Sequence, residues 1–436
     1  MRRPRPRTVV FAGVAALVVA VGLVAVRLDV RDLEARLVRE ANEVVAAPRP
    51  RPVHVERPAH GTLGDALARH LPALEKAWKD LEGDAEAGSA VHAIVLGDRP
   101  IADLPDVYAR ALRQVEDDLD GVLLGTHAER ADLAPADDPF MPSNGATWAG
   151  YQLAARLSAV RVRAALASGR SDAAARDCLD GLALGRDAAI AGALVGRMVR
   201  AAAMASVGPP CADAIQALPR EERRVVAARV RGIRDAVPGL EAMVREEALQ
   251  TQLLVYGSQL AAASRAQLLE RPRAWASQST PPGLWQRLLG RAAWRGLRGA
   301  YDELIRLAAL HGADRDRAFE ELATKYDGKW SPFARLFGPL ARNLASYGRR
   351  DDAAVLRVDL VILSAAARTH REERGAWPRS VEDLAAAGLL SPEERVRLGS
   401  TSFAAEDGAG DLHVTVPLPA GGEGDPTEAR ARVRAP

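Results

Sequence analysis

The feature that most constrains this chain is an uncharged apolar run of 18 residues near its N-terminus, residues 9–26. As an α-helix with about 1.5 Å rise per residue, this run spans roughly 27 Å, close to the hydrocarbon thickness of a bilayer, about 30 Å. We therefore predict a single transmembrane helix over residues 9–26. A cleaved signal peptide is the alternative, but its apolar core is usually about 7 to 15 residues long, and no small-x-small site precedes the charged residues after the run. A buried core helix is the other alternative.

The charges around the run predict its orientation. Four arginines lie in the basic tail of residues 1–8: Arg2, Arg3, Arg5 and Arg7. Such a tail stays in the cytoplasm, although further arginines follow the run from Arg27 onward. We predict a protein of the bacterial inner membrane whose C-terminal domain lies in the periplasm.

The net charge of +2 comes from 59 Lys and Arg against 57 Asp and Glu, so the four tail arginines account for the whole excess. The rest of the chain is slightly acidic and offers no broad basic surface. We therefore expect no nucleic-acid partner.

Composition predicts an all-α fold. Aromatic residues make up only 4% of a chain that is 48% hydrophobic, so Ala, Leu and Val must form the core, as in packed helices. After the membrane helix we predict an irregular array of antiparallel helical hairpins, with a small β-hairpin near the C-terminus. The predicted divisions are a juxtamembrane helix and Pro/Arg-rich spacer (27–58), an extracytoplasmic helical domain (59–390), a short helix and small β element (391–418) and a disordered tail (419–436).

Two similar segments suggest a weak internal repeat. Leu166 and Leu344 each begin a run with a glycine, an arginine, a polar residue and an Ala-rich stretch. Gly169 and Gly348 are suited to the left-handed conformation that ends a helix. The pattern predicts a turn between two helices at each glycine, as in tetratricopeptide-type hairpins, although no regular period joins the two copies.

The most specific local motif is Gly-Ala-Trp-Pro-Arg-Ser-Val-Glu-Asp-Leu, within residues 374–384. Its structural residues are Gly375, Trp377, Pro378, Ser380 and Asp383. The glycine is expected to end a long helix, the tryptophan to fold back, and the serine to cap a short helix. The motif resembles the G-x-[YW]-P element of pseudopilin-like proteins over about residues 350–385. The whole layout resembles uncharacterised single-pass bacterial envelope proteins with an Arg/Ala-rich helical body, and the resemblance implies no activity.

Local motifs for chemistry are missing. The sequence contains no nucleophile elbow, phosphate loop, dinucleotide fingerprint or paired-histidine zinc motif. Residues 116–127 place Glu116, Asp118, Asp120 and Gly121 as in an EF-hand loop, but position 12 is His127 rather than a carboxylate, so an acidic helix end is the preferred interpretation. We predict no catalytic residue, cofactor or metal site, while a site assembled from distant segments stays open.

Two features are candidates for further contacts. Cys178 and Cys211 either bridge two helical segments or are small core residues. The helix expected around residues 284–305 carries a possible interaction surface for anionic lipid or an acidic partner. Its residues are Arg287, Arg291, Trp294, Arg295 and Arg298. A core helix with a solvated arginine face is the alternative.

The sequence as a whole favours a binding or scaffolding protein of the cell envelope with protein partners. The alternatives are an envelope hydrolase with a non-local active site and an accessory component of a secretion or pilus-like machine.

Overall fold

The computed structural model describes residues 31–47, 54, 59–130, 145–191, 193–277, 279, 284–327, 332–406, 410–420 and 426–435. The predicted tail (1–8), the predicted membrane helix (9–26) and most of the spacer lie outside these residues. Among the helices that the structure describes, none combines the length and the apolar character needed to cross a membrane. The chain divides into two compact units, one of Met1–Pro48 with Arg245–Asp302 and the other of Arg49–Val244 with Glu303–Pro436.

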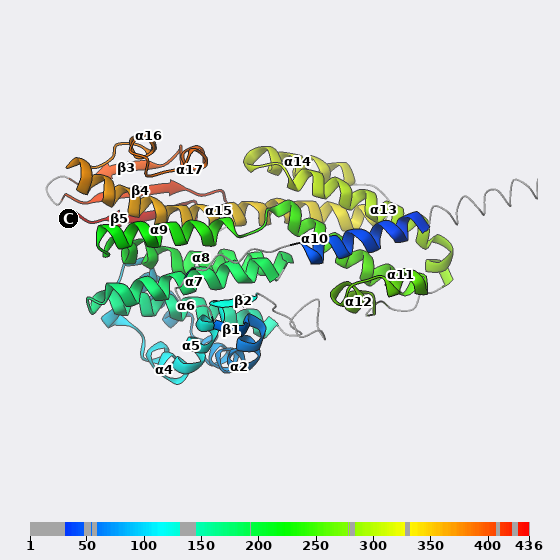
Figure 1. The fold of residues 1–436 in the computed structure, drawn as a ribbon, viewed down its shortest axis with the longest axis horizontal. Helices are drawn as coiled ribbons and strands as arrows, with labels where there is room; N and C mark the ends of the chain where they lie inside the picture. Colours follow the sequence, from blue (N-terminus) through cyan, green and yellow to red (C-terminus); the bar gives the residue numbers. More distant parts are fainter. Residues whose placement is uncertain are drawn as a thin grey trace, which may run out of the picture. The chain divides into compact units, whose positions relative to one another are not determined.

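The larger unit is built of helical hairpins (Figure 1), so the predicted all-α class is confirmed for this part of the chain. In it α8 packs against α6, α7 and α15, while α14 packs against α15 and α2 against α5 and α6. The helices are α2 (Leu63–Leu81), α3 (Ala85–Leu96), η1 (Ile101–Asp103), α4 (Asp106–Gln114), α5 (Glu116–Gly125), α6 (Gly145–Ala167), α7 (Ser171–Ala191), α8 (Ala193–Gln216), α9 (Arg220–Asp235), α14 (Gly312–Tyr326), α15 (Pro332–Arg374), α16 (Val381–Ala386) and α17 (Pro392–Arg397).

The core of this unit is aliphatic. Alanines at the contacts of α6, α7 and α8, such as Ala154, Ala183 and Ala203, are almost fully buried. Small side chains let helix axes approach closely, so an aromatic-poor chain still forms a dense interior. The Ala-rich composition therefore suits helix-on-helix packing here.

The smaller unit contains a helix over residues 31–46, within the segment 27–58 in which a juxtamembrane helix is predicted. It also contains η2 (Gly257–Gln259), α11 (Ala262–Ala266), α12 (Glu270–Ser277) and most of α10 (Leu240–Tyr256) and α13 (Leu284–Ala308). The 31–46 helix is held by side chains. The amide of Asn42 donates to the carbonyl of Gln267 at 2.8 Å and its oxygen accepts from the backbone N–H of Leu269 at 2.9 Å.

The C-terminal strands differ from the prediction. The expected hairpin is present as β3 (Ser402–Ala405) and β4 (Leu412–Pro417), but a third strand, β5 (Glu428–Val433), pairs antiparallel with β4. The prediction of a disordered tail over 419–436 is therefore wrong for β5. Its side chains alternate, with Ala431 and Val433 buried and Arg430 and Arg432 exposed, and this period of two is that of a half-buried strand.

The second copy of the weak repeat is not a turn. Gly169 has φ 68° and ends α6 as predicted, but α15 continues without a break through Gly348 for 43 residues. A side chain at Gly348 would lie 2.5 Å from the guanidinium carbon of Arg315. This glycine therefore makes room for an arginine that binds Asp352, and the hairpin expected there is wrong.

Candidate functional site

Three ionisable side chains from distant segments meet inside the larger unit: His54, His127 and Asp180. Oδ1 of Asp180 lies 3.1 Å from Nε2 of His54 and 2.7 Å from Nε2 of His127. The two imidazole rings meet edge to face, with centroids 5.2 Å apart. His54 is 2% exposed, while the side chains of Asp180 and His127 are 13% and 15% exposed. The cluster is therefore buried on the His54 side and reachable from solvent on the other.

The fold brings these residues together through a short parallel strand pair. The strands β1 (Ala59–Thr62) and β2 (Ala128–Arg130) pair with Ala59 opposite Ala128. His127 directly precedes β2 and His54 lies a few residues before β1, so the pairing brings the two chain segments together. Asp180 is on α7, which contacts α5, the helix that ends just before His127.

A close helix contact fixes the position of His127. α5 ends at Gly125, where an added Cβ would lie 2.7 Å from Cβ of Ala66 and 2.9 Å from Cδ1 of Leu63. Because glycine has no side chain, the end of α5 can pack directly against the start of α2. Thr126 follows as the cap residue, and its hydroxyl donates to the carbonyl of Leu123 at 2.7 Å.

The electrostatics of the cluster favour an ionised aspartate between imidazoles. Burial lowers the pKa of His54, and the hydrogen bond and charge of Asp180 only partly oppose this. Burial would raise the pKa of Asp180, but the hydrogen bonds from His127 and His54 outweigh it, so the pKa is lowered. A carboxylate only accepts hydrogen bonds, so both Nε2 atoms donate to it. Nε2 of His54 also lies 3.3 Å from the hydroxyl of Thr126.

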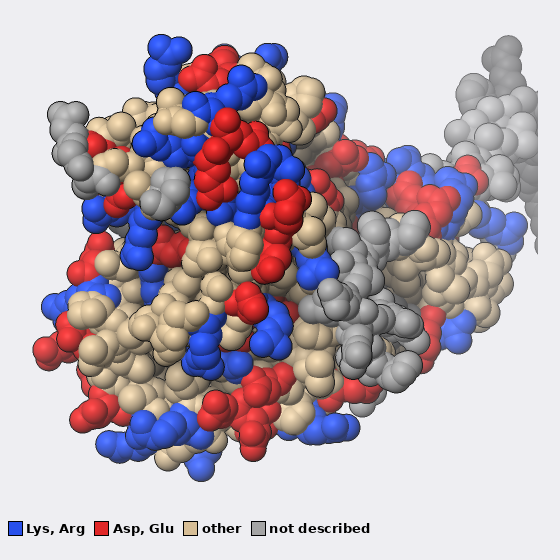
Figure 2. All heavy atoms as spheres, turned by 60° about the vertical axis from the view of Figure 1, so that its left-hand side comes forward, with Lys and Arg blue, Asp and Glu red and all other residues tan. Residues whose placement is uncertain are grey.

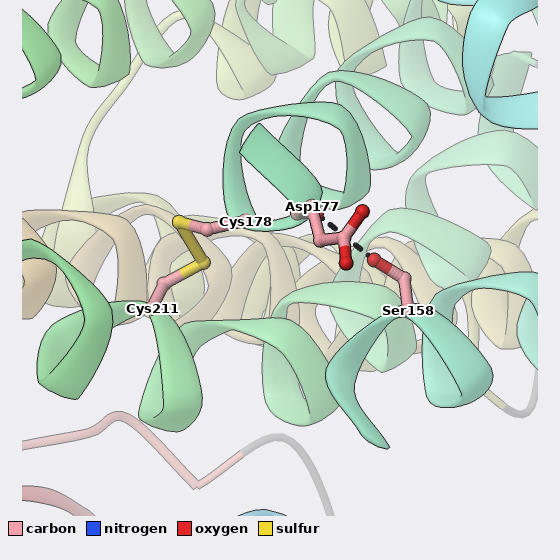
Figure 3. Close-up of a disulfide and its surroundings, with 4 residues drawn as sticks. All are labelled: Ser158, Asp177, Cys178 and Cys211. Atoms are coloured by element: carbon pink, nitrogen blue, oxygen red, sulfur yellow. Dashed lines mark hydrogen bonds between the residues drawn. A yellow bond between two sulfur atoms is a disulfide. The ribbon is translucent and has the colours of Figure 1, made fainter. Parts of the chain in front are cut away.

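A second charged group lies one turn away on α7. Arg161 binds Asp177 with two hydrogen bonds, of 3.0 and 3.3 Å, and also contacts Asp120. Burial raises the pKa of Asp177, and Arg161 opposes the shift. The backbone carbonyl of Asp177 accepts from Ser158 on α6 at 2.9 Å (Figure 3).

A disulfide joins α7, the helix that carries Asp180, to α8. Cys178 and Cys211 are bonded, with Cα atoms 5.2 Å apart, and both side chains are buried (Figure 3). Of the two alternatives left open by the sequence, the bridge is the one present. Cys178 lies two residues before Asp180, so the bond fixes the helix that carries the central carboxylate.

The sequence predicts no metal site, and no local pattern in it indicates this cluster. His54 lies in the segment interpreted as a spacer, yet it is buried and bonded to Asp180, so the spacer interpretation is wrong at this residue. In the sequence, His127 stands out only as the residue at position 12 of the EF-hand-like run, where a carboxylate is required. Residues 116–125 form helix α5 rather than a loop, so their carboxylates do not surround one point. Gly121 lies inside this helix and makes room for His70.

The predicted interaction surface on α13 is only partly described. The side chains of Arg287 and Arg291 lie outside the described residues, and Arg295 is exposed. Trp294 and Arg298 are 3% and 5% exposed, which contradicts a surface role for these two. Trp294 stacks on Tyr256 and donates to Gln252 at 3.1 Å, while Arg298 binds Glu40 at 2.7 Å. Arg298 is buried because it forms an ion pair with Glu40 of the 31–46 helix.

The structure also describes the Gly-x-Trp-Pro motif. Gly375 has φ 72° just after α15 ends, and Pro378 follows Trp377, whose indole N–H donates to the carbonyl of Gly410. Ser380 accepts from the backbone N–H of Asp383 at 3.4 Å at the start of α16. The motif therefore connects the end of the long helix to the C-terminal sheet.

On the face shown in Figure 2, Lys and Arg side chains are intermixed with Asp and Glu rather than gathered by sign. Comparison of the chain with protein-family models, with curated proteins and with solved structures finds no match to any of them.

Proposed function

We propose that this protein is anchored in the bacterial inner membrane by residues 9–26 and acts in the periplasm as a binding or scaffolding protein of the cell envelope. The observation that carries the proposal is the buried Cys178–Cys211 disulfide. Disulfides persist in oxidising compartments and are rare in the bacterial cytoplasm. Together with the uncharged run behind an arginine-rich tail, the bond supports export of the helical body.

A binding role is supported by the kind of frame that the helices form. The 43 residues of α15 make one long helix against which α8, α9 and α14 pack. Such a frame leaves outer helix faces on which a partner can dock, and a standard protein interface needs only about 800 Å² on each partner. Partners in the envelope are therefore expected to be proteins, with the membrane contacted through the single span.

Topology is tested with the full chain in bacteria. Alkaline phosphatase fused to the C-terminus is expected to be active, and a green fluorescent protein fusion dark, if the body lies in the periplasm. The chain should stay in the membrane pellet after alkaline extraction. Its two cysteines should react with a thiol reagent only after reduction. Release into the supernatant, or two free thiols in the native protein, would contradict the proposal.

A variant with Arg2, Arg3, Arg5 and Arg7 replaced by glutamine is the matched control for orientation. It keeps the apolar run but removes the basic tail, so we expect lower phosphatase activity per molecule. Chemical crosslinking in intact cells, followed by purification from membranes, then tests the scaffold role. Recovery of the chain without any crosslinked envelope protein would contradict that role.

The second candidate is an envelope hydrolase with a non-local site, favoured by the meeting of His54, His127 and Asp180. Imidazole and carboxylate groups at this spacing can activate water directly or through a metal. Hydrolysis of peptidoglycan fragments by the wild-type chain, lost in Asp180→Asn and kept in His70→Gln, would support it. An inactive wild-type chain would rule out this substrate.

A further inference from the structure

We propose that His54, His127 and Asp180 form a binding site for a divalent first-row transition metal ion such as Zn²⁺. Each residue offers one ligand atom, and these atoms lie within 4.8 Å of one another. We assign Nε2 of each histidine and Oδ1 of the aspartate as the ligands, because each Nε2 faces that oxygen. The inference is separate from the membrane anchor and from the scaffold role, because it rests only on this cluster.

The distances within the cluster suit the exchange of two hydrogen bonds for a metal. In a tetrahedral zinc site, bonds of about 2.0–2.2 Å place neighbouring ligand atoms roughly 3.3 Å apart. Oδ1 of Asp180 lies 3.1 and 2.7 Å from the two imidazole nitrogens. To reach the tetrahedral spacing, Oδ1 must move roughly 0.2 Å further from Nε2 of His54 and roughly 0.6 Å further from Nε2 of His127, and small side-chain rotations allow this. The ion would replace the two N–H protons that now point at the carboxylate, and each imidazole would carry its proton on Nδ1.

The choice of donor atoms indicates the class of ion. Two imidazole nitrogens with one carboxylate oxygen suit Zn²⁺ and its first-row neighbours, whereas Ca²⁺ and Mg²⁺ prefer oxygen ligands alone. Three protein ligands leave a fourth position for water or for a group of a bound partner. The exposed fractions of Asp180 and His127 give that position a route to solvent.

The ligands are held in place before any ion binds. Asp180 follows Cys178 on α7 by two residues, and the disulfide ties that helix to α8. The β1–β2 pairing joins the segments of His54 and His127. The disulfide and the strand pairing limit how far the ligands can move apart, and such preorganisation favours binding of the ion.

The same unit contains a natural comparison. Nδ1 of His70 lies 3.0 Å from Oδ1 of Asp118, and this pair is not part of a three-ligand group among the described residues. It has the same chemistry as the cluster but one ligand fewer. His70→Gln is therefore a matched control for His127→Gln, because both variants remove one imidazole that contacts an aspartate.

The test uses the full chain, purified in mild detergent without a polyhistidine tag and stripped of metal with a chelator. Calorimetric titration with ZnCl₂ and elemental analysis after dialysis should find one Zn²⁺ per chain. Asp180→Asn and His127→Gln should each lower the affinity by at least about tenfold. His70→Gln should bind as the wild type does. Circular dichroism and thermal unfolding without metal establish that each variant folds.

The outcomes separate clearly. Zinc binding that depends on Asp180 and His127 but not on His70 supports the site. A wild-type chain that retains no Zn²⁺, or equal affinity in all four proteins, overturns it. If the cluster variants do not fold, the wild type with Co²⁺ decides. Intense visible absorption of a tetrahedral complex, abolished by excess Zn²⁺, supports the site, and the lack of such absorption overturns it.

Discussion

Two clusters of the larger unit each hold buried carboxylates, but the groups that hydrogen-bond to these carboxylates differ. Around α9, α15 and α17, Glu394 and Asp359 are fully buried and bonded to arginines. Arg231 binds Glu394 through two hydrogen bonds of 2.8 and 3.2 Å, Arg397 binds Asp359 at 2.9 Å, and Arg234 contacts both carboxylates. Each negative charge therefore has cations of the protein's own beside it.

Around Asp180 the hydrogen-bonding partners are imidazoles instead. An imidazole can give up the proton that it donates and present a lone pair, whereas a guanidinium cannot be deprotonated in a protein. The arginine network is therefore closed to added cations, while the histidine cluster keeps atoms that can bind one. Whether a buried carboxylate can share a metal ion therefore depends on the kind of group that faces it more than on the number of buried charges.

Removal of one arginine from the closed network should have the largest effect. Arg234→Met leaves Asp359 and Glu394 buried with fewer partners, and breaking such a pair from one side costs about 3–5 kcal/mol. Urea unfolding followed by circular dichroism measures the loss. Arg379→Met, which removes the exposed pair with Asp383, should cost less than about 1 kcal/mol. Equal losses in both variants would contradict the assigned role of burial.

The disulfide should matter more to the histidine cluster than to the arginine network. Cys178 and Cys211 close a loop with a sequence separation of 33, and a bond of this span stabilises a fold by roughly 3–4 kcal/mol. The double variant to alanine should unfold at lower urea concentration and bind Zn²⁺ more weakly, since α7 carries Asp180. Unchanged zinc affinity at a lower stability would show that α7 is positioned without the bond.

The arginine network should also make the free energy of unfolding depend on pH. Burial alone would raise the pKa of Glu394, but hydrogen bonds from Arg231, Ser391 and Arg234 lower it from 4.5 to about 2. A lowered carboxyl pKa stabilises the fold above about pH 4.5, and this contribution is lost as the pH falls towards 2. The shift corresponds to about 3 kcal/mol. The free energy of unfolding of the wild type, measured by urea unfolding, should therefore fall more steeply between pH 5 and 2 than that of Glu394→Gln. The same pH dependence in both proteins would contradict the assignment.

The sequence predicts helices well and clusters poorly, for a physical reason. Helix ends depend on neighbouring residues, so Gly169 and the cap at Ser380 are visible in the pattern. Gly348 shows where prediction from local sequence fails. A glycine that ends a helix and a glycine that makes room for a guanidinium group cannot be told apart from the neighbouring residues. Only packing against Arg315 distinguishes them.

The histidine cluster lies beyond local patterns altogether. His54, His127 and Asp180 are far apart in the chain and share no spacing rule. Their meeting depends on the pairing of β1 with β2 and on α5 against α7, which are tertiary contacts. The sequence offers one signal: the EF-hand-like run that begins at Glu116 has His127 at position 12, where a calcium loop needs a carboxylate.

The smallest predicted effect concerns Gly125, and it tests how rigidly the cluster is held. Gly125→Ala would place a Cβ within 3 Å of Leu63 and Ala66, so α5 must shift away from α2, at a cost of about 1–3 kcal/mol. Because His127 follows two residues later, zinc affinity should fall as well. Gly88→Ala on α3 is the control, because nothing lies within 4 Å of the added Cβ. That substitution should stabilise the helix by roughly 0.5–1 kcal/mol and leave zinc binding unchanged. A Gly125→Ala chain with wild-type zinc affinity would mean that the histidine side chain absorbs the shift, and that the close contact of α5 with α2 does not set the geometry of the cluster.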